Sequence, residues 1–378
     1  MKFIIILFGF LQFTCAQQVI YLRNLKGGNL ENPINSTAPY SVYVSASEDS
    51  NEILSQIFVK TYDNLSRSLL DLKNSKANLT SGLLTPFKIS TNAIVTSVLT
   101  DEKLSTLTGF LYVTTTKQSN DPIFQVYDVD QSQTIQTHYN ANHTIVLLNT
   151  HRNISSSTKM SNWYQDYRAS VSMFKGYPKD QEEQQEDVLF ANPAMYFFKP
   201  VFVPNVETFS VNFEIFYFKI FAPVSFTISP TLFDLNGYST TAYKTTGFFL
   251  KPADSNQTAE ISCLHDSRYN GTVGVLIGAT GHNPHAKLIL DTVKDNGNSY
   301  RDQLDIAIGG IMIGMIPKSF TISTSDTDGV EVYVQYFVLQ DQLIPPTTTT
   351  EAPETTTKLG SGLGVAGVMM LTFLFRYF

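Results

Sequence analysis

Loop carboxylates are the first residues in this sequence whose type and placement suggest metal chemistry. Asp101, Asp326 and Asp328 each lie between an apolar run and a later apolar run. Carboxylate oxygens in such loops are ligands that Ca²⁺ accepts. Asp beside Gly also forms turns by hydrogen bonding to its own backbone, as Asp328 beside Gly329 would. We expect turns at these positions and keep a weak calcium site as the alternative.

A histidine pair and a glycine-rich run suggest two further chemistries. His282 and His285 are metal-ligand types, but no cysteine or carboxylate triad stands near them, so the zinc signal is weak. The run from Gly274 to Gly281 is similar to a dinucleotide loop, which needs a helix after it. A strand-like run follows instead, so we expect a turn between strands. The sequence also has no Gly-x-Ser-x-Gly or His-Glu-x-x-His motif.

Cys263 is the one cysteine expected in the mature chain, because Cys15 falls within a leader segment. Its neighbours alternate, with Ile261 on the same face and Glu260 on the opposite face. We therefore predict that Cys263 is a buried free thiol in the core. A bridge to a second chain is the alternative.

The N-terminus has the features of a secretory signal. Lys2 precedes an apolar run from Phe3 to Phe13, and the small residue Ala16 ends a suitable cleavage site. Sequons for N-glycosylation follow in the part of the chain expected to be secreted. Every asparagine that carries a glycan must lie on the protein surface. These candidate sites are Asn35, Asn64, Asn78, Asn142, Asn153, Asn256 and Asn270.

The C-terminus has the order of a membrane-anchoring segment. A Thr/Pro/Glu tract over residues 347–357 leads to the small residues Gly360 and Ser361 and then to an apolar tail. Small residues before such a tail are typical of a GPI-attachment signal, with Gly360 and Ser361 as candidate attachment sites. A single span is the alternative, since 17 uncharged residues extend for roughly 25 Å as a helix. Both anchors place the body of the protein outside the cell.

Charge and aromatic content narrow the class of protein further. The formal net charge is −7 and no basic cluster occurs, which argues against nucleic acid as a partner. The 27 Phe and 19 Tyr residues favour strands. Short β-prone runs alternate with turn residues along most of the chain, as in all-β sandwiches. The longest predicted strand is Val211–Phe221, and Asn296-Gly297 predicts a hairpin.

These elements predict two β-sandwich domains in tandem, of the jelly-roll type. The acidic run over residues 180–187 contains no apolar side chain, and we interpret it as part of a linker between the domains. A calcium-binding cluster is the alternative interpretation. The expected division is a signal at 1–16, a first domain at 17–175, a linker at 176–187 and a second domain at 188–341. A stalk at 342–358 and the anchor tail at 359–378 complete it.

Two stretches resemble the end of a CUB domain. One is Asn92-Ala-Ile-Val-Thr-Ser-Val-Leu-Thr-Asp101 followed by Gly109-Phe110, and the other runs from Ser319 to Asp326. Together with the signal, the sequons and the tail, the chain resembles CUB-like secreted glycoproteins of nematodes, which are associated with gut-surface responses to pathogens. The resemblance implies an extracellular β-sandwich that binds proteins or glycans. It also implies that Asp63 and Asp101 are the two aspartates of a calcium site.

The function expected from the sequence is that of a cell-surface glycoprotein with a binding or adhesion role. No cofactor is required beyond the weak calcium candidates, and the expected partner is an extracellular protein or glycan. A secreted hydrolase, whose catalytic residues meet only in the fold, is one alternative. A structural coat glycoprotein that assembles laterally is the other.

Overall fold

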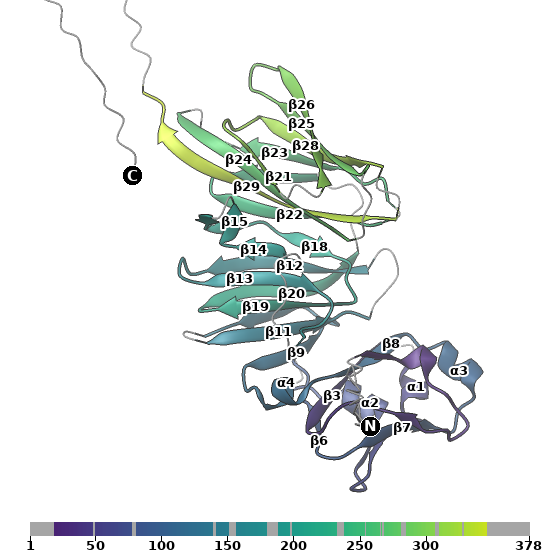
Figure 1. Cartoon of the computed structure of the whole chain (residues 1–378). Coiled ribbons are helices and arrows are strands. Elements are labelled where there is room, and N and C mark those ends of the chain that lie inside the picture. Colours follow the sequence, from purple (N-terminus) through teal and green to yellow (C-terminus); the bar gives the residue numbers. More distant parts are fainter. Residues whose placement is uncertain are drawn as a thin grey trace, which may run out of the picture. The chain divides into compact units, whose positions relative to one another are not determined.

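β-strands make up most of the described part of the chain (Figure 1). The computed structural model describes residues 19–47, 50–77, 81–138, 141–150, 156–179, 188–196, 199–232, 238–253, 255–264, 266, 268–280, 285–306, 310–326 and 329–345. These residues are 57% strand and 9% helix, which confirms the all-β prediction. They belong to one compact unit that ends at Leu343, apart from Ile344 and Pro345, which begin a second unit.

The first third of the chain forms two four-stranded sheets. Sheet 1 has the order β2 (Asn32–Pro33), β7 (Ala93–Ser97), β4 (Ile57–Thr61) and β5 (Ser66–Ser68). Sheet 2 has the order β1 (Val19–Tyr21), β8 (Gly109–Val113), β3 (Tyr40–Ala46) and β6 (Phe87–Ile89). The short helices of the described chain also lie here: η1 (Leu22–Asn24), α1 (Asn51–Leu54), α2 (Leu69–Lys73), α3 (Asp101–Ser105) and α4 (Thr116–Asn120).

The middle of the chain forms two more sheets and a small hairpin. Sheet 3 has the order β14 (Val188–Asn192), β13 (Ser170–Lys175), β19 (Ile215–Phe221), β11 (Asn142–Leu148) and β9 (Phe124–Asp128). Sheet 4 has the order β10 (Gln133–Gln136), β20 (Val224–Leu232), β12 (Ser156–Gln165) and β18 (Phe209–Val211). The hairpin pairs β15 (Ala194–Tyr196) with β16 (Lys199–Val201).

Strands between residues 205 and 343 form two five-stranded sheets. Sheet 5 has the order β17 (Asn205–Val206), β22 (Thr245–Lys251), β29 (Glu331–Leu343), β24 (Tyr269–Thr280) and β27 (Gly310–Ile313). Sheet 6 has the order β21 (Tyr238–Ala242), β23 (Ala259–Leu264), β28 (Ser319–Ser325), β25 (Lys287–Val293) and β26 (Ser299–Asp305). Gly297, with a φ of 82°, closes the predicted hairpin between β25 and β26.

Apolar side chains join these sheets face to face in a series. One cluster lies between sheets 1 and 2, and another between sheets 3 and 4. A third cluster joins sheets 5 and 6, and a fourth connects the second face of sheet 2 with the second face of sheet 3. Strand β3 is consequently buried at all seven positions, because both of its faces are covered.

An aromatic group forms much of the core between sheets 3 and 4. Trp163, the single tryptophan, stacks on Phe226 with 4.7 Å between ring centroids and an interplanar angle of 15°. It meets the edges of Phe190 and Phe218 at 5.8 and 6.2 Å. Such ring pairs each add about 0.5–1.5 kcal/mol beyond the burial of their area.

The structure corrects the predicted domain boundary at residues 176–187. Strands β13 and β14, on either side of this segment, pair with each other in sheet 3, with Val171 opposite Asn192. The segment therefore connects neighbouring strands of one sheet and does not separate two domains. Its acidic part, residues 180–187, lies outside the described residues. Two tandem sandwiches are not confirmed, because the six larger sheets form three face-to-face pairs.

Two strand predictions also need correction. The run from Val211 to Phe221 is not one strand, since β18 ends at Val211 and β19 begins at Ile215. The expected turn within residues 274–281 is wrong, because Gly274 and Gly278 lie inside strand β24. A Cβ at Gly274 would be 2.2 Å from the ring of Phe337, and one at Gly278 would be 1.8 Å from the ring of Tyr333. Rings from the neighbouring strand β29 therefore require glycine at both positions.

Candidate functional site

The aspartates proposed as calcium ligands are not brought together. Asp63, Asp101 and Asp326 are all exposed and lie in separate segments: Asp63 and Asp326 are in loops, and Asp101 begins helix α3. Asp328 is outside the described residues. The Oδ1 atom of Asp101 accepts a hydrogen bond of 2.6 Å from the backbone N–H of Gly27. Asp101 thus serves a structural contact between segments that are 74 residues apart. Across the described ranges, no three His, Cys, Asp or Glu side chains lie close enough to hold one metal ion.

The other motif residues do not form a centre either. His285 is exposed, while His282 lies outside the described residues. His143 is buried, and its Nε2 atom accepts a hydrogen bond from the backbone N–H of His138. Burial lowers the pKa of His143. A neutral, backbone-bound imidazole of this kind is a structural group.

The sequons of the described chain lie at the surface, as glycosylation requires. Five of the seven are described and all five are exposed, whereas Asn78, Asn153 and the tail residues Gly360 and Ser361 lie outside the described part. The exposed sites are Asn35, Asn64, Asn142, Asn256 and Asn270.

Cys263 is a buried free thiol, as its alternating neighbours predict. Its side chain is 7% exposed, and Ile261 beside it is fully buried. Burial raises the pKa of Cys263 to about 12, and the negative charges of Glu207 and Asp295 contribute. The thiolate that a nucleophile requires is therefore suppressed at neutral pH.

A buried carboxyl group links sheets 2 and 3. Asp128, at the end of β9, accepts a 2.5 Å hydrogen bond from the hydroxyl of Ser45 on β3. Burial raises the pKa of Asp128 to about 7; Ser45 lowers it, Asp130 raises it, and the charges of Lys76 and Lys73 lower it. Because Ser45 and Asp128 are 0% and 2% exposed, no substrate can reach this pair. The pair is a structural contact in which Asp128 can gain or lose a proton.

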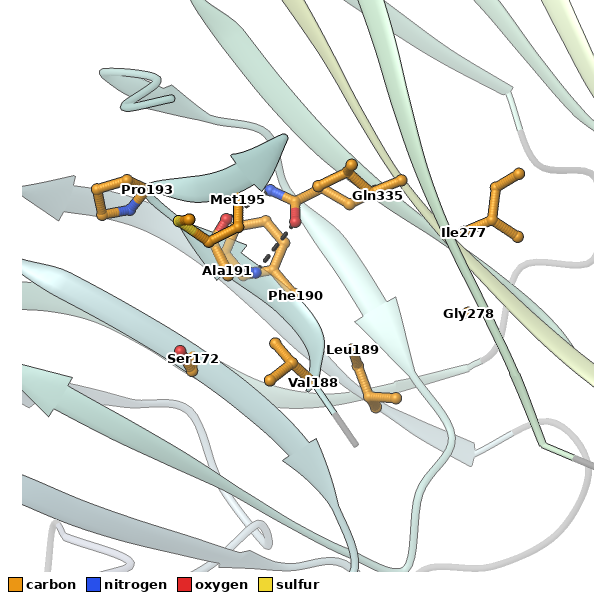
Figure 2. Close-up of a pocket in the computed structure, with 11 residues that line it drawn as sticks. Ser172, Val188, Leu189, Phe190, Ala191, Pro193, Met195, Ile277, Gly278 and Gln335 are labelled. Carbon is orange, nitrogen blue, oxygen red and sulfur yellow. Dashed lines mark hydrogen bonds between the residues drawn. The ribbon is translucent and has the colours of Figure 1, made fainter. Parts of the chain in front are cut away.

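The pocket that best suits a ligand lies beside the edge strand β14 (Figure 2). It has a volume of about 350 Å³, within the range of sites for small groups. Strands of sheet 3 and the β15 hairpin line one side, and strands of sheet 5 line the other. We call it the β14 pocket; its lining includes Val188, Leu189, Met195, Leu276, Ile277 and Gln335.

Gln335 fixes one wall of the β14 pocket. Its Oε1 accepts a 3.0 Å hydrogen bond from the N–H of Ala191, and its Nε2 donates to the carbonyl of Ala191 at 2.8 Å. Figure 2 shows the amide of Gln335 turned toward Ala191. The same Nε2 also lies 3.1 Å from the hydroxyl of Thr246. These bonds cap the open edge of β14, so the amide holds the wall in place. Apolar atoms make up slightly more of the pocket surface than polar atoms do.

The rim of the β14 pocket is accessible. Met195 is 46% exposed, and Val188 and Ile277 are half-buried. Methionine is flexible and polarizable, and it is common on surfaces that adapt to apolar partners. The pocket could not be found from the sequence, because its walls come from residues 172 to 335 and no local motif marks them.

A second hollow, of about 400 Å³, lies near α4 and is lined by more polar residues. Gln118, one of them, donates from its Nε2 to the carbonyl of Pro178 at 2.8 Å. Its Oε1 accepts from the N–H of Thr115 at 3.2 Å. The amide of Gln118 is therefore already hydrogen-bonded within the protein, and this hollow is the weaker candidate for a ligand site.

Comparison with known proteins identifies the family. The sequence matches the family described as transmembrane glycoprotein over residues 37–374, most of the chain. This chain belongs to the transmembrane glycoprotein family. Membership indicates a cell-surface or envelope glycoprotein with its body on the extracellular side of a membrane. Among the described residues no helix is long and apolar enough to cross a membrane; the tail at 359–378 lies outside them.

Other comparisons add little. No curated protein matches the sequence. One solved structure that it matches is BpGH86A, a β-porphyranase of glycoside hydrolase family 86 from the human gut bacterium Bacteroides plebeius. The identity is 11%, the match covers 65% of this chain and 42% of the porphyranase chain, and the TM-score is 0.14. A score this low carries no argument about fold or activity. The resemblance to CUB domains finds no support in these comparisons.

Proposed function

We propose that this member of the transmembrane glycoprotein family is a cell-surface binding protein that recognises an extracellular protein partner. The partner inserts an apolar side chain into the β14 pocket. The supporting observation is the pocket itself, an accessible hollow with aliphatic side chains in its lining and a wall that is held by Gln335. Apolar hollows with a few fixed polar groups are the usual form of recognition sites.

The aliphatic side chains of the lining favour a protein partner over a glycan. Carbohydrates are bound through many hydrogen bonds to their hydroxyl groups, and the polar atoms of Gln335 are occupied by Ala191 and Thr246. An aliphatic or aromatic side chain needs no such bonds. Burying one fully in a pocket contributes about 1.5–3 kcal/mol, enough to anchor a contact between two proteins.

The two alternative functions lack a comparable observation in the described residues. A hydrolase would use a reactive group at an accessible surface, but Ser45 and Asp128 are buried and Cys263 has a raised pKa. A coat protein joined through Cys263 would need that side chain to point outward, and it points into the core.

Pocket variants of the secreted ectodomain, residues 17–345, test the proposal. The probe is the uncharged apolar dye N-phenyl-1-naphthylamine, titrated against wild type, Met195→Lys and Val188→Lys. A lysine at either position puts a charge at the apolar rim, and we expect the dye affinity to fall at least about tenfold. Met315→Lys is the matched control, because Met315 is a methionine of similar exposure, 58%, away from the pocket lining.

Competition on cells then tests recognition. Labelled ectodomain is bound to cells and displaced with excess unlabelled protein. Wild type and Met315→Lys should compete, whereas Met195→Lys should not. Equal competition by Met195→Lys would exclude the pocket as the binding site. Displacement by free oligosaccharides would instead indicate a glycan partner.

A further inference from the structure

The hairpin between β4 and β5 carries a sequon at its tip. The backbone N–H of Asn64 donates to the carbonyl of Thr61 at 3.1 Å, and the N–H of Thr61 donates to the carbonyl of Leu65 at 2.9 Å. Asn64 has a φ of 67°. These features define a three-residue loop, in which a turn is followed by a left-handed residue that forms a bulge. The loop is Tyr62-Asp63-Asn64.

An aromatic ring stands two residues before the sequon asparagine. Tyr62 is 64% exposed, far more than a tyrosine that completes a core. Among the ring and cation contacts of the described residues, none involves Tyr62. Its ring therefore offers an open face to the solvent, next to the point where a glycan would be attached.

Asp63, which lies between Tyr62 and Asn64 in the loop, makes its side-chain contact elsewhere. The carboxylate of Asp63 turns toward the neighbouring loop, where the hydroxyl of Ser90 donates to its Oδ2 at 3.4 Å. Tyr62 and Asn64, the first and third loop residues, are at most about 7 Å apart along the chain. At this spacing, a sugar attached to Asn64 is within reach of the exposed ring of Tyr62.

We propose that Asn64 carries an N-glycan whose first sugar packs on the ring of Tyr62 and stabilises the β4–β5 hairpin. In the attachment, Nδ2 of Asn64 loses a proton and bonds to the anomeric carbon of a lipid pyrophosphate-linked oligosaccharide, whose pyrophosphate leaves. The hydroxyl of Ser66 completes the sequon. The C–H groups on one face of a sugar carry partial positive charge and are attracted to the negative face of an aromatic ring.

Asn64 has a second reason to be asparagine, because this residue tolerates the left-handed conformation better than most. Ser66→Ala separates the two roles. It removes the sequon and the glycan, and it leaves the asparagine, the loop backbone and Tyr62 unchanged. Ser66 is exposed and pairs with Lys60 through the backbone, so this substitution has little effect of its own on the fold.

The test is a double-mutant cycle on the full glycosylated chain, with occupancy of Asn64 first confirmed by mass spectrometry. The variants are Ser66→Ala, Tyr62→Thr and both together, compared by thermal unfolding. We expect glycan loss to shift the unfolding equilibrium roughly fivefold when Tyr62 is present, and by less than half of that in Tyr62→Thr. Equal shifts in both backgrounds, or an unoccupied Asn64, would overturn the proposal.

Asn35 provides the matched control sequon within the same pair of sheets. It has Pro33 in place of an aromatic residue at the corresponding position, and Thr37→Ala removes its glycan. The effect of Thr37→Ala should be the same with and without Tyr62→Thr.

Enzymatic trimming separates the first sugar from the rest of the glycan. An endoglycosidase that leaves one N-acetylglucosamine on Asn64 should preserve the stability, since the packed sugar remains. If the stability is lost on trimming, the outer sugars carry the effect and the contact with Tyr62 is refuted.

Discussion

Replacement of Asp128 by Asn should remove a large part of the pH dependence of folding. The pKa of Asp128 is about 7 in the fold, against 3.8 for an ordinary aspartate, mainly because the group is buried. The folded state therefore binds this proton more tightly than the unfolded state does. The neutral carboxyl stabilises the fold fully below pH 3.8, and this contribution is lost as the pH rises to about 7.

The magnitude follows from the same two values. The difference between about 7 and 3.8, at about 1.36 kcal/mol per unit, gives roughly 4 kcal/mol as an upper estimate. In Asp128→Asn the new amide stays neutral at every pH and its oxygen can still accept the hydrogen bond from Ser45. The free energy of unfolding of the variant, relative to wild type, should therefore rise by several kcal/mol between pH 4 and pH 8.

Urea unfolding at four pH values measures this difference. Fluorescence of Trp163, the single tryptophan, reports on the core between sheets 3 and 4. Glu102→Gln is the control, because Glu102 is an exposed carboxylate of α3 and should leave the wild-type pH dependence unchanged. If Asp128→Asn keeps the wild-type pH dependence, Asp128 is not the buried proton-binding group and the reasoning is refuted.

Two further predictions concern Cys263 and the anchor. The buried thiol, whose pKa is about 12, should react with thiol reagents only after denaturation, and the chain should run as a monomer on non-reducing gels; a dimer band that disappears in Cys263→Ser would contradict this. The order of residues in the tail predicts release from cells by phosphatidylinositol-specific phospholipase C; retention, with recovery of a peptide containing Arg376, would show a single span instead.

The sequence predicts those features of the fold that depend on neighbouring residues. Alternation of apolar and polar side chains identifies the buried face at Cys263, and Asn296-Gly297 identifies the hairpin between β25 and β26. Both signals are local, since they arise from the period of a strand and from the geometry of a tight turn.

Features that depend on distant residues could not be predicted. The pairing of β13 with β14 joins strands on either side of an acidic run, which by composition alone is typical of a linker. Only glycine fits at Gly274 and Gly278, because aromatic rings on β29 occupy the space that a Cβ atom would need. The neighbouring sequence does not indicate this requirement. The contact between Ser45 and Asp128 spans 83 residues for the same reason.

Display of a glycosylated body outside the membrane is the property on which the proposed function depends most. Intact cells that express the full chain can be labelled with a membrane-impermeant biotin reagent, and the labelled protein then treated with an N-glycosidase. We predict that the chain is labelled and loses mass on deglycosylation, with peptides showing occupied sites among Asn35, Asn64, Asn142, Asn256 and Asn270. A chain that remains unlabelled on intact cells, with an unchanged mass after the enzyme, would contradict the assignment.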